Sequence, residues 1–124
     1  MKTKYLRLSK KAASRGIHRQ HKHGAVLVNG NRVLAIGFNN SGKTHPTMPW
    51  PKGIHAESAA IHRAQQARLS TVGSTLYVVR ENSNHKPGMS RPCKSCHAIL
   101  VKAGVKNVFF TQADGTIGEL KLLS

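Results

Sequence analysis

Two apolar runs separated by an Asn-Gly turn constrain the fold of this chain more than any other local feature. Residues 25–28 and 32–36 are rich in aliphatic side chains, and Asn29, Gly30 and Asn31 lie between them. Asn and Gly tolerate positive φ angles, so an Asn-Gly pair between two such runs is the strongest short-range signal for a β-hairpin. The sequence therefore predicts two antiparallel strands at this position.

Helical and strand-like spacings alternate along the rest of the chain. Apolar residues at helical spacing predict helices over residues 2–15, 55–67 and 93–103. Short apolar runs predict further strands at residues 76–79, 107–111 and 116–122, the last two joined by a turn at Asp114-Gly115. The predicted order is α-β-β-α-β-α-β-β, which indicates an α/β fold with a five-stranded mixed sheet and helices packed on its faces.

Three polar segments are expected to be loops, at residues 17–23, 37–54 and 81–91. The longest of them, 37–54, contains three Pro and three Gly and cannot form a regular element. A loop of this length inside a compact domain usually has a function.

The chain length of 124 residues predicts one domain covering residues 1–124, with enough buried surface to fold without disulfides. No apolar run approaches the roughly 18 residues that a membrane span needs. The basic first residues are not followed by the apolar segment of a signal peptide. We therefore expect a cytoplasmic protein that makes no membrane contact.

The charge balance is strongly one-sided. Twenty Lys and Arg residues face four acids, and the formal net charge is +16 at pH 7. A field of this sign attracts nucleotides, single-stranded nucleic acid or other polyanions. The alternative interpretation is that the charge serves solubility alone. The four acids are Glu57, Glu81, Asp114 and Glu119.

The two cysteines, Cys93 and Cys96, have C-x-x-C spacing. Without a secretion signal, a reducing environment is expected and a structural disulfide is not. The pair is then either a redox couple or half of a zinc site.

A histidine before the second predicted helix favours the zinc site. His55 begins that helix, and the two cysteines begin the next one. In a β-α-β-α-β arrangement consecutive helix starts lie at the same edge of the sheet, so one imidazole and two thiols should meet there. These ligands suit zinc, and three of them leave one tetrahedral position open, as in catalytic zinc sites. Glu57 at the same helix start could act as a general base.

The combination of His55-Ala56-Glu57 with Pro92-Cys93-Lys94-Ser95-Cys96 resembles the zinc-dependent cytidine and deoxycytidylate deaminase superfamily. The resemblance extends to the β-hairpin, to Gly-Phe-Asn at residues 37–39 and to the strand between the two motifs. It implies a three-layer α/β/α cytidine deaminase-like fold and a hydrolase that releases ammonia from a nucleobase.

The resemblance also implies a role for each matching residue. His55, Cys93 and Cys96 would bind Zn²⁺, which would activate water for addition to C4 of cytosine or C6 of adenine. Glu57 would carry protons to the ring nitrogen and to the departing ammonia. The Ala56 backbone N–H would bind a ring carbonyl, and Asn39 would hold the sugar.

The substrate is less constrained than the chemistry. The Asp114-Gly115 hairpin resembles the cytidine deaminase branch, which favours a cytosine nucleoside or nucleotide over adenosine or tRNA. One alternative is a cytosine deaminase acting on single-stranded DNA or RNA. Another is a basic nucleic-acid-binding module with a structural zinc, although such a site has no use for Glu57. The resemblance is also compatible with assembly into a homo-oligomer.

Overall fold

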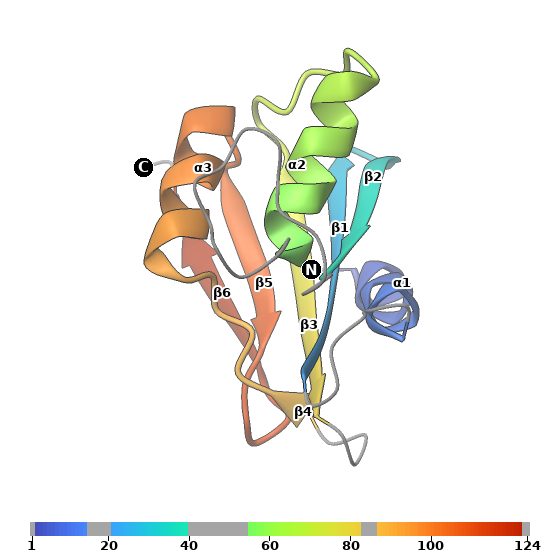
Figure 1. Cartoon of the computed structure of the whole chain (residues 1–124), viewed down its shortest axis with the longest axis vertical. Coiled ribbons are helices and arrows are strands. Elements are labelled where there is room, and N and C mark those ends of the chain that lie inside the picture. The colour runs from blue at the N-terminus through green and yellow to red at the C-terminus, as the bar shows by residue number, and fades with distance from the viewer. Residues whose placement is uncertain (1, 15–20, 40–54, 83–86, 123–124) are drawn as a thin grey trace.

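A computed structural model describes residues 2–14, 21–39, 55–82 and 87–122. Figure 1 shows a mixed sheet with α2 and α3 side by side on its near face. The elements are α1 (Thr3–Ala13), β1 (His21–Asn29), β2 (Arg32–Phe38), α2 (Ala56–Gln66), β3 (Thr75–Asn82), β4 (Pro87–Gly88), α3 (Lys94–Ala103), β5 (Asn107–Thr111) and β6 (Ile117–Lys121). None of the helices in these ranges is both long and apolar enough to span a membrane.

The sheet has the strand order β2-β1-β3-β5-β6, and β4 pairs with β3 outside this path. β3 and β5 are parallel, whereas β1 pairs antiparallel with both β2 and β3 and β6 pairs antiparallel with β5. The predicted α/β class, the mixed sheet and the C-terminal hairpin are therefore confirmed.

The first hairpin closes through Gly30 and Asn31, because Asn29 pairs with Arg32 across the two strands. Gly30 has a φ of 62°, in the left-handed region that glycine enters without steric cost. Asn29 ends β1 and does not belong to the turn itself.

All three predicted loops include residues that belong to strands, and β2 continues to Phe38, inside the expected loop 37–54. β1 begins at His21, inside the expected loop 17–23, and β3 continues to Asn82, inside the expected loop 81–91. The start of β1 and the end of β3 pair with each other, with Lys22 opposite Glu81. The expected loop 81–91 also contains β4, a short sixth strand that the sequence did not predict. Strand pairing satisfies these backbone groups without any apolar pattern in the sequence, which is why periodicity missed them.

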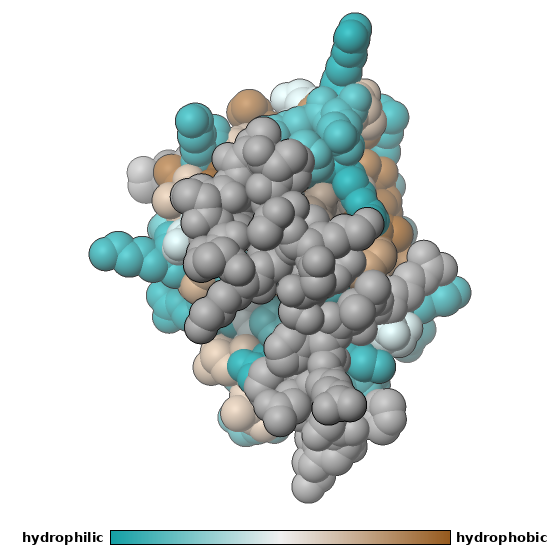
Figure 2. Space-filling model, viewed as in Figure 1, coloured by the Kyte–Doolittle hydropathy of each residue, from teal (hydrophilic) through white to brown (hydrophobic). Residues whose placement is uncertain are grey.

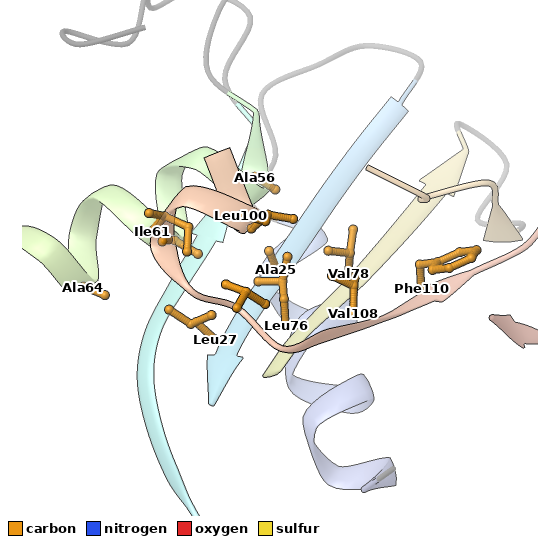
Figure 3. Close-up of a cluster of buried hydrophobic side chains, with 13 residues drawn as sticks. Ala25, Leu27, Ala56, Ile61, Ala64, Leu76, Val78, Leu100, Val108 and Phe110 are labelled. Carbon is orange, nitrogen blue, oxygen red and sulfur yellow. The ribbon is translucent and has the colours of Figure 1, made fainter. Parts of the chain in front are cut away.

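Alternate residues along the strands face two separate cores. Figure 3 shows the larger core, where side chains of β1, β3 and β5 such as Leu27, Val78 and Val108 pack with Ile61 of α2 and Leu100 of α3. The smaller core lies between the opposite face of the sheet and α1, and it contains Tyr5, Val26, Val28 and Tyr77. This arrangement is the three-layer α/β/α architecture that the resemblance implied.

Two glycines of the hairpin let helices approach the sheet backbone closely. A Cβ on Gly37 would lie 2.6 Å from the Ala60 nitrogen and closer still to the Ala56 carbonyl oxygen, both in α2. A Cβ on Gly24 would collide in the same way with Ser9 and Ala13 of α1. Because the obstructing atoms belong to helix backbones, a side-chain rotation cannot relieve either collision. Gly37 therefore fixes the distance of the first turns of α2 from β2.

We expect Gly37→Ala to lower the free energy of unfolding by about 3 kcal/mol, the upper range for overpacking in a core, because α2 must shift to admit the methyl group. Urea unfolding followed by circular dichroism measures the change. Val33→Ala in the same strand is the control, because the Val33 side chain is exposed and should cost less than about 1 kcal/mol. Equal stability of Gly37→Ala and the parent chain would contradict the close approach.

Candidate metal centre and active site

Two helix starts bring three metal-binding side chains together. His55 is the N-cap residue of α2 and Cys93 is the N-cap residue of α3, and neither side chain caps its own helix. The Nδ1 atom of His55 instead lies 3.8 Å from Sγ of Cys93 and 3.4 Å from Sγ of Cys96. All three ligand atoms lie within 4.8 Å of one another.

The spacing of these atoms fits a tetrahedral metal ion. Zinc binds thiolate at roughly 2.3 Å and imidazole nitrogen at roughly 2.0 Å, so tetrahedral ligands lie roughly 3.5–3.8 Å apart. The two nitrogen–sulfur distances in the structure are close to this separation. Neither cysteine forms a disulfide. The imidazole beside the pair makes a metal site a better explanation than a redox couple, and three ligands leave a fourth position for water or substrate.

The surroundings of the cluster disfavour the thiolate form of Cys96. Burial raises the pKa of the Cys96 thiol far above its ordinary value, and the nearby charges of Glu57 and Cys93 raise it further. Cys96 is buried and Cys93 is exposed, so the cluster lies at the boundary of the core. A divalent cation would oppose these effects by stabilising thiolate, and its binding would release protons.

Glu57, the second residue of α2, is a buried carboxyl group beside this cluster. Its side chain is 4% exposed, and its Oε1 atom has no hydrogen-bond partner among the described residues. Burial raises the pKa of Glu57, while its own backbone N–H, His55 and Cys96 partly offset the rise. A buried carboxyl oxygen without a partner is costly unless a bound molecule completes its hydrogen bonding. The arrangement suits a group that exchanges protons with water or substrate.

The two predicted substrate contacts have different surroundings. Ala56 is the first residue of α2 and is fully buried, and the first hydrogen bond within the helix runs from the Ala59 N–H to the His55 carbonyl. The Ala56 N–H is thus one of the donors that a helix start leaves for other acceptors. Asn39 directly follows β2, where its side-chain oxygen accepts a hydrogen bond of 2.9 Å from the His23 backbone N–H. Both roles stay predictions, and residues 40–54 of the expected functional loop lie outside the described residues.

The predicted helix over residues 93–103 is observed as α3, one residue shorter at its start. Pro92 directly precedes Cys93, the N-cap, and α3 begins at Lys94. The predicted helix end is correct, because Gly104 terminates α3 in the left-handed conformation at a φ of 82°.

Ser90 anchors the segment before Cys93, and the sequence analysis did not identify it. Its hydroxyl donates to the Val78 carbonyl at 2.9 Å and accepts from the Thr111 N–H at 2.7 Å. The Ser90 N–H also donates to the Thr111 carbonyl at 2.9 Å. These bonds join the approach to α3 to the parallel strands β3 and β5. Ser90 lies in a polar stretch with no distinctive spacing, so no local signal could have found it.

We expect Ser90→Ala to lower the free energy of unfolding by about 2–3 kcal/mol, because the Thr111 N–H would lose its partner in a buried place. Chemical denaturation measures the loss. Ser95→Ala is the matched control, since Ser95 is exposed in α3 and should stay within about 0.5 kcal/mol of the parent. Equal effects of the two substitutions would show that Ser90 is not an anchor.

Comparison with known proteins agrees with this geometry. The sequence model described as the cytidine and deoxycytidylate deaminase zinc-binding region matches residues 1–112. A deoxycytidylate deaminase of Mycobacterium phage D29 is 26% identical over 127 residues, covering 86% of this chain and 90% of that protein.

Solved structures share the fold. The dCMP deaminase of cyanophage S-TIM5, in complex with dCMP and dUMP, superposes with a TM-score of 0.70 at 22% identity, covering 90% of this chain and 84% of that one. The cytidine deaminase of Burkholderia pseudomallei superposes with a TM-score of 0.75 at 20% identity, covering 98% of this chain and 93% of that one.

Proposed function

Because the chain belongs to the cytidine and deoxycytidylate deaminase zinc-binding family, we propose that it converts cytosine to uracil in a cytidine or deoxycytidine nucleoside or nucleotide. Water adds its oxygen to C4 of the base, the bond from C4 to the amino nitrogen breaks, and ammonia leaves. The observation that carries the proposal is the cluster of His55, Cys93 and Cys96 with the buried carboxyl group of Glu57 beside it.

His55, Cys93 and Cys96 would hold the zinc ion. When bound, zinc acts as a Lewis acid that lowers the pKa of water. The donor set supports this assignment, because two thiols and one imidazole at two helix starts match the ligands that zinc prefers. The helix N-termini also favour negative charge on the two sulfur atoms.

Glu57 would carry the protons of the reaction. Its carboxylate would take a proton from water and deliver it to N3 of the ring. It would then take the second proton from the hydroxyl group added at C4 and pass it to the amino nitrogen, which leaves as ammonia. The buried position and the unpartnered Oε1 atom support this role, because a proton carrier needs a place on its carboxyl group for each proton. The Ala56 N–H would donate to the base carbonyl, and Asn39 would contact the sugar.

A 5′-nucleotide is the substrate form that we favour. The formal net charge of +16 attracts phosphate, and the phage relative is named a deoxycytidylate deaminase. Figure 2 shows hydrophilic side chains projecting around the rim of the face that carries α2 and α3. The antiparallel β5–β6 hairpin resembles the nucleoside branch instead, so the nucleoside remains a required comparison in any test.

We expect one zinc ion per chain in purified protein, and its loss in Cys93→Ala, because two remaining ligands bind zinc far more weakly than three. Elemental analysis by mass spectrometry measures the zinc content. His97→Ala is the matched control, since His97 adjoins Cys96 but lies outside the ligand cluster. Full zinc content in Cys93→Ala would exclude the proposed ligand set.

We expect Glu57→Gln to retain zinc and to lose at least about 100-fold in deamination rate, the scale of general acid–base catalysis. Conversion of dCMP to dUMP, followed by chromatography, measures the rate. Glu119→Gln is the control, because it removes a carboxylate on β6 that lies outside the cluster. Similar rates for both variants would assign proton transfer to another group.

The same assay tests the substrate form with cytidine, deoxycytidine, dCMP and a single-stranded oligodeoxynucleotide. We expect uracil formation from the free monomers, with kcat/KM for dCMP about tenfold above that for deoxycytidine, the effect of one charge-assisted phosphate contact. Activity confined to the oligonucleotide would replace this proposal with the polynucleotide alternative.

A further inference from the structure

A cavity of about 250 Å³ lies on the α1 face of the sheet, opposite to the face that carries the candidate metal ligands. One wall is formed by Leu6, Arg7 and Lys10 of α1. The floor includes Val79 and Thr111 of β3 and β5, and Ile117 of β6. The cavity shares no residue with the cluster of His55, Cys93 and Cys96.

The cavity exists because α1 covers only part of its face of the sheet. The helix packs mainly against β1 and β3, so β5 and β6 extend beyond it. Figure 1 shows α1 on the β1 side of the molecule and β6 on the other side. The side of α1 and the adjoining uncovered part of β5 and β6 together form a concave site with a largely apolar floor.

The charges around this cavity are predominantly positive. Arg7 and Lys10 are three residues apart, so they share one side of α1, and both are exposed. Neither has an ion-pair partner within the described part of the chain. Arg80 also lines the cavity, and Glu81 is the one acidic residue among the described residues that line it. The cavity therefore favours an anionic group over a cationic one.

We propose that this cavity binds a small organic anion, with its charged group between Arg7 and Lys10 and its apolar body against Val79 and Ile117. The apolar floor excludes a bare inorganic ion as the best ligand, because such an ion would leave this surface uncovered. The volume suits a body of the size of one aromatic ring with its charged substituent. The site lies on the opposite face of the sheet from the proposed catalytic centre, so anion binding can be tested separately from deaminase activity.

Phenyl phosphate is a suitable probe because it combines an aromatic ring with a phosphate group. It is titrated into isotope-labelled zinc-loaded protein, and nuclear magnetic resonance follows the methyl signals of Leu6, Val79 and Ile117. We expect saturable shifts at these methyl groups. Inorganic phosphate should bind at least about tenfold more weakly, because it lacks the ring that would bury apolar surface.

Two variants with the same loss of charge separate a built site from general attraction to a basic protein. Arg7→Gln should weaken phenyl phosphate binding about tenfold, the effect of losing one charge-assisted hydrogen bond. Lys11→Gln removes an exposed charge of α1 that does not line the cavity, and it should change the affinity by less than about twofold. Equal weakening in both variants would overturn the proposal.

A third variant tests the cavity without altering its charge. Ile117→Trp should fill the space and abolish the shifts at Leu6 and Val79, and its amide spectrum reports whether the fold is kept. Unchanged binding by a folded Ile117→Trp protein, or shifts confined to residues around His55, would also overturn the proposal. If inorganic phosphate bound as tightly as phenyl phosphate, the aromatic ring would add no affinity, and the proposed apolar contact would be wrong.

Discussion

The parallel pairing of β3 with β5 is the constraint on which the candidate site depends. α2 precedes β3 and α3 precedes β5, and both helices lie on the same face of the sheet. Since the two strands run in the same direction, the two helices begin at the same edge. An antiparallel β5 would move the start of α3 to the opposite edge, roughly 15 Å away for a strand of this length. The cysteines could then not meet His55.

The starts of α2 and α3 bring together side chains that repel one another when they are ionised. Two thiols and a carboxyl group meet at a place where burial raises the pKa of both Cys96 and Glu57. Positive charge that offsets these negative groups comes from the N-termini of α2 and α3 and, in the proposed enzyme, from the metal ion. Glu57 differs from the thiols because one of its oxygens has no partner among the described residues. The structure therefore separates groups suited to holding a cation from a group suited to moving protons.

Local signals in the sequence were sufficient for the parts of the molecule that local physics determines. The turn of the first hairpin, the glycine that ends α3 and the two motifs at the helix starts each occupy a few consecutive residues. The first residues of β1 and the anchoring role of Ser90 depend instead on partners more than ten residues away. The short β4 depends on pairing with the end of β3. Their sequences are polar and show no periodicity, so only strand pairing in three dimensions reveals them. Asn39 and Ala56 have positions in the structure, but their roles depend on a substrate.

The two halves of the cluster formed by His55, Cys93 and Cys96 are attached to the sheet through different contacts. On the α2 side, Gly37 allows direct contact between the backbones of β2 and the first turns of the helix, so steric exclusion fixes the position of His55. On the α3 side, Ser90 fixes the approach to Cys93 through hydrogen bonds to β3 and β5. A steric contact resists compression only, whereas a set of directed hydrogen bonds resists movement in several directions. The Arg63 side chain of α2 adds one directed hydrogen bond of 2.7 Å to the Ile36 carbonyl of β2, so the α2 side is held against sliding along the sheet as well as against compression.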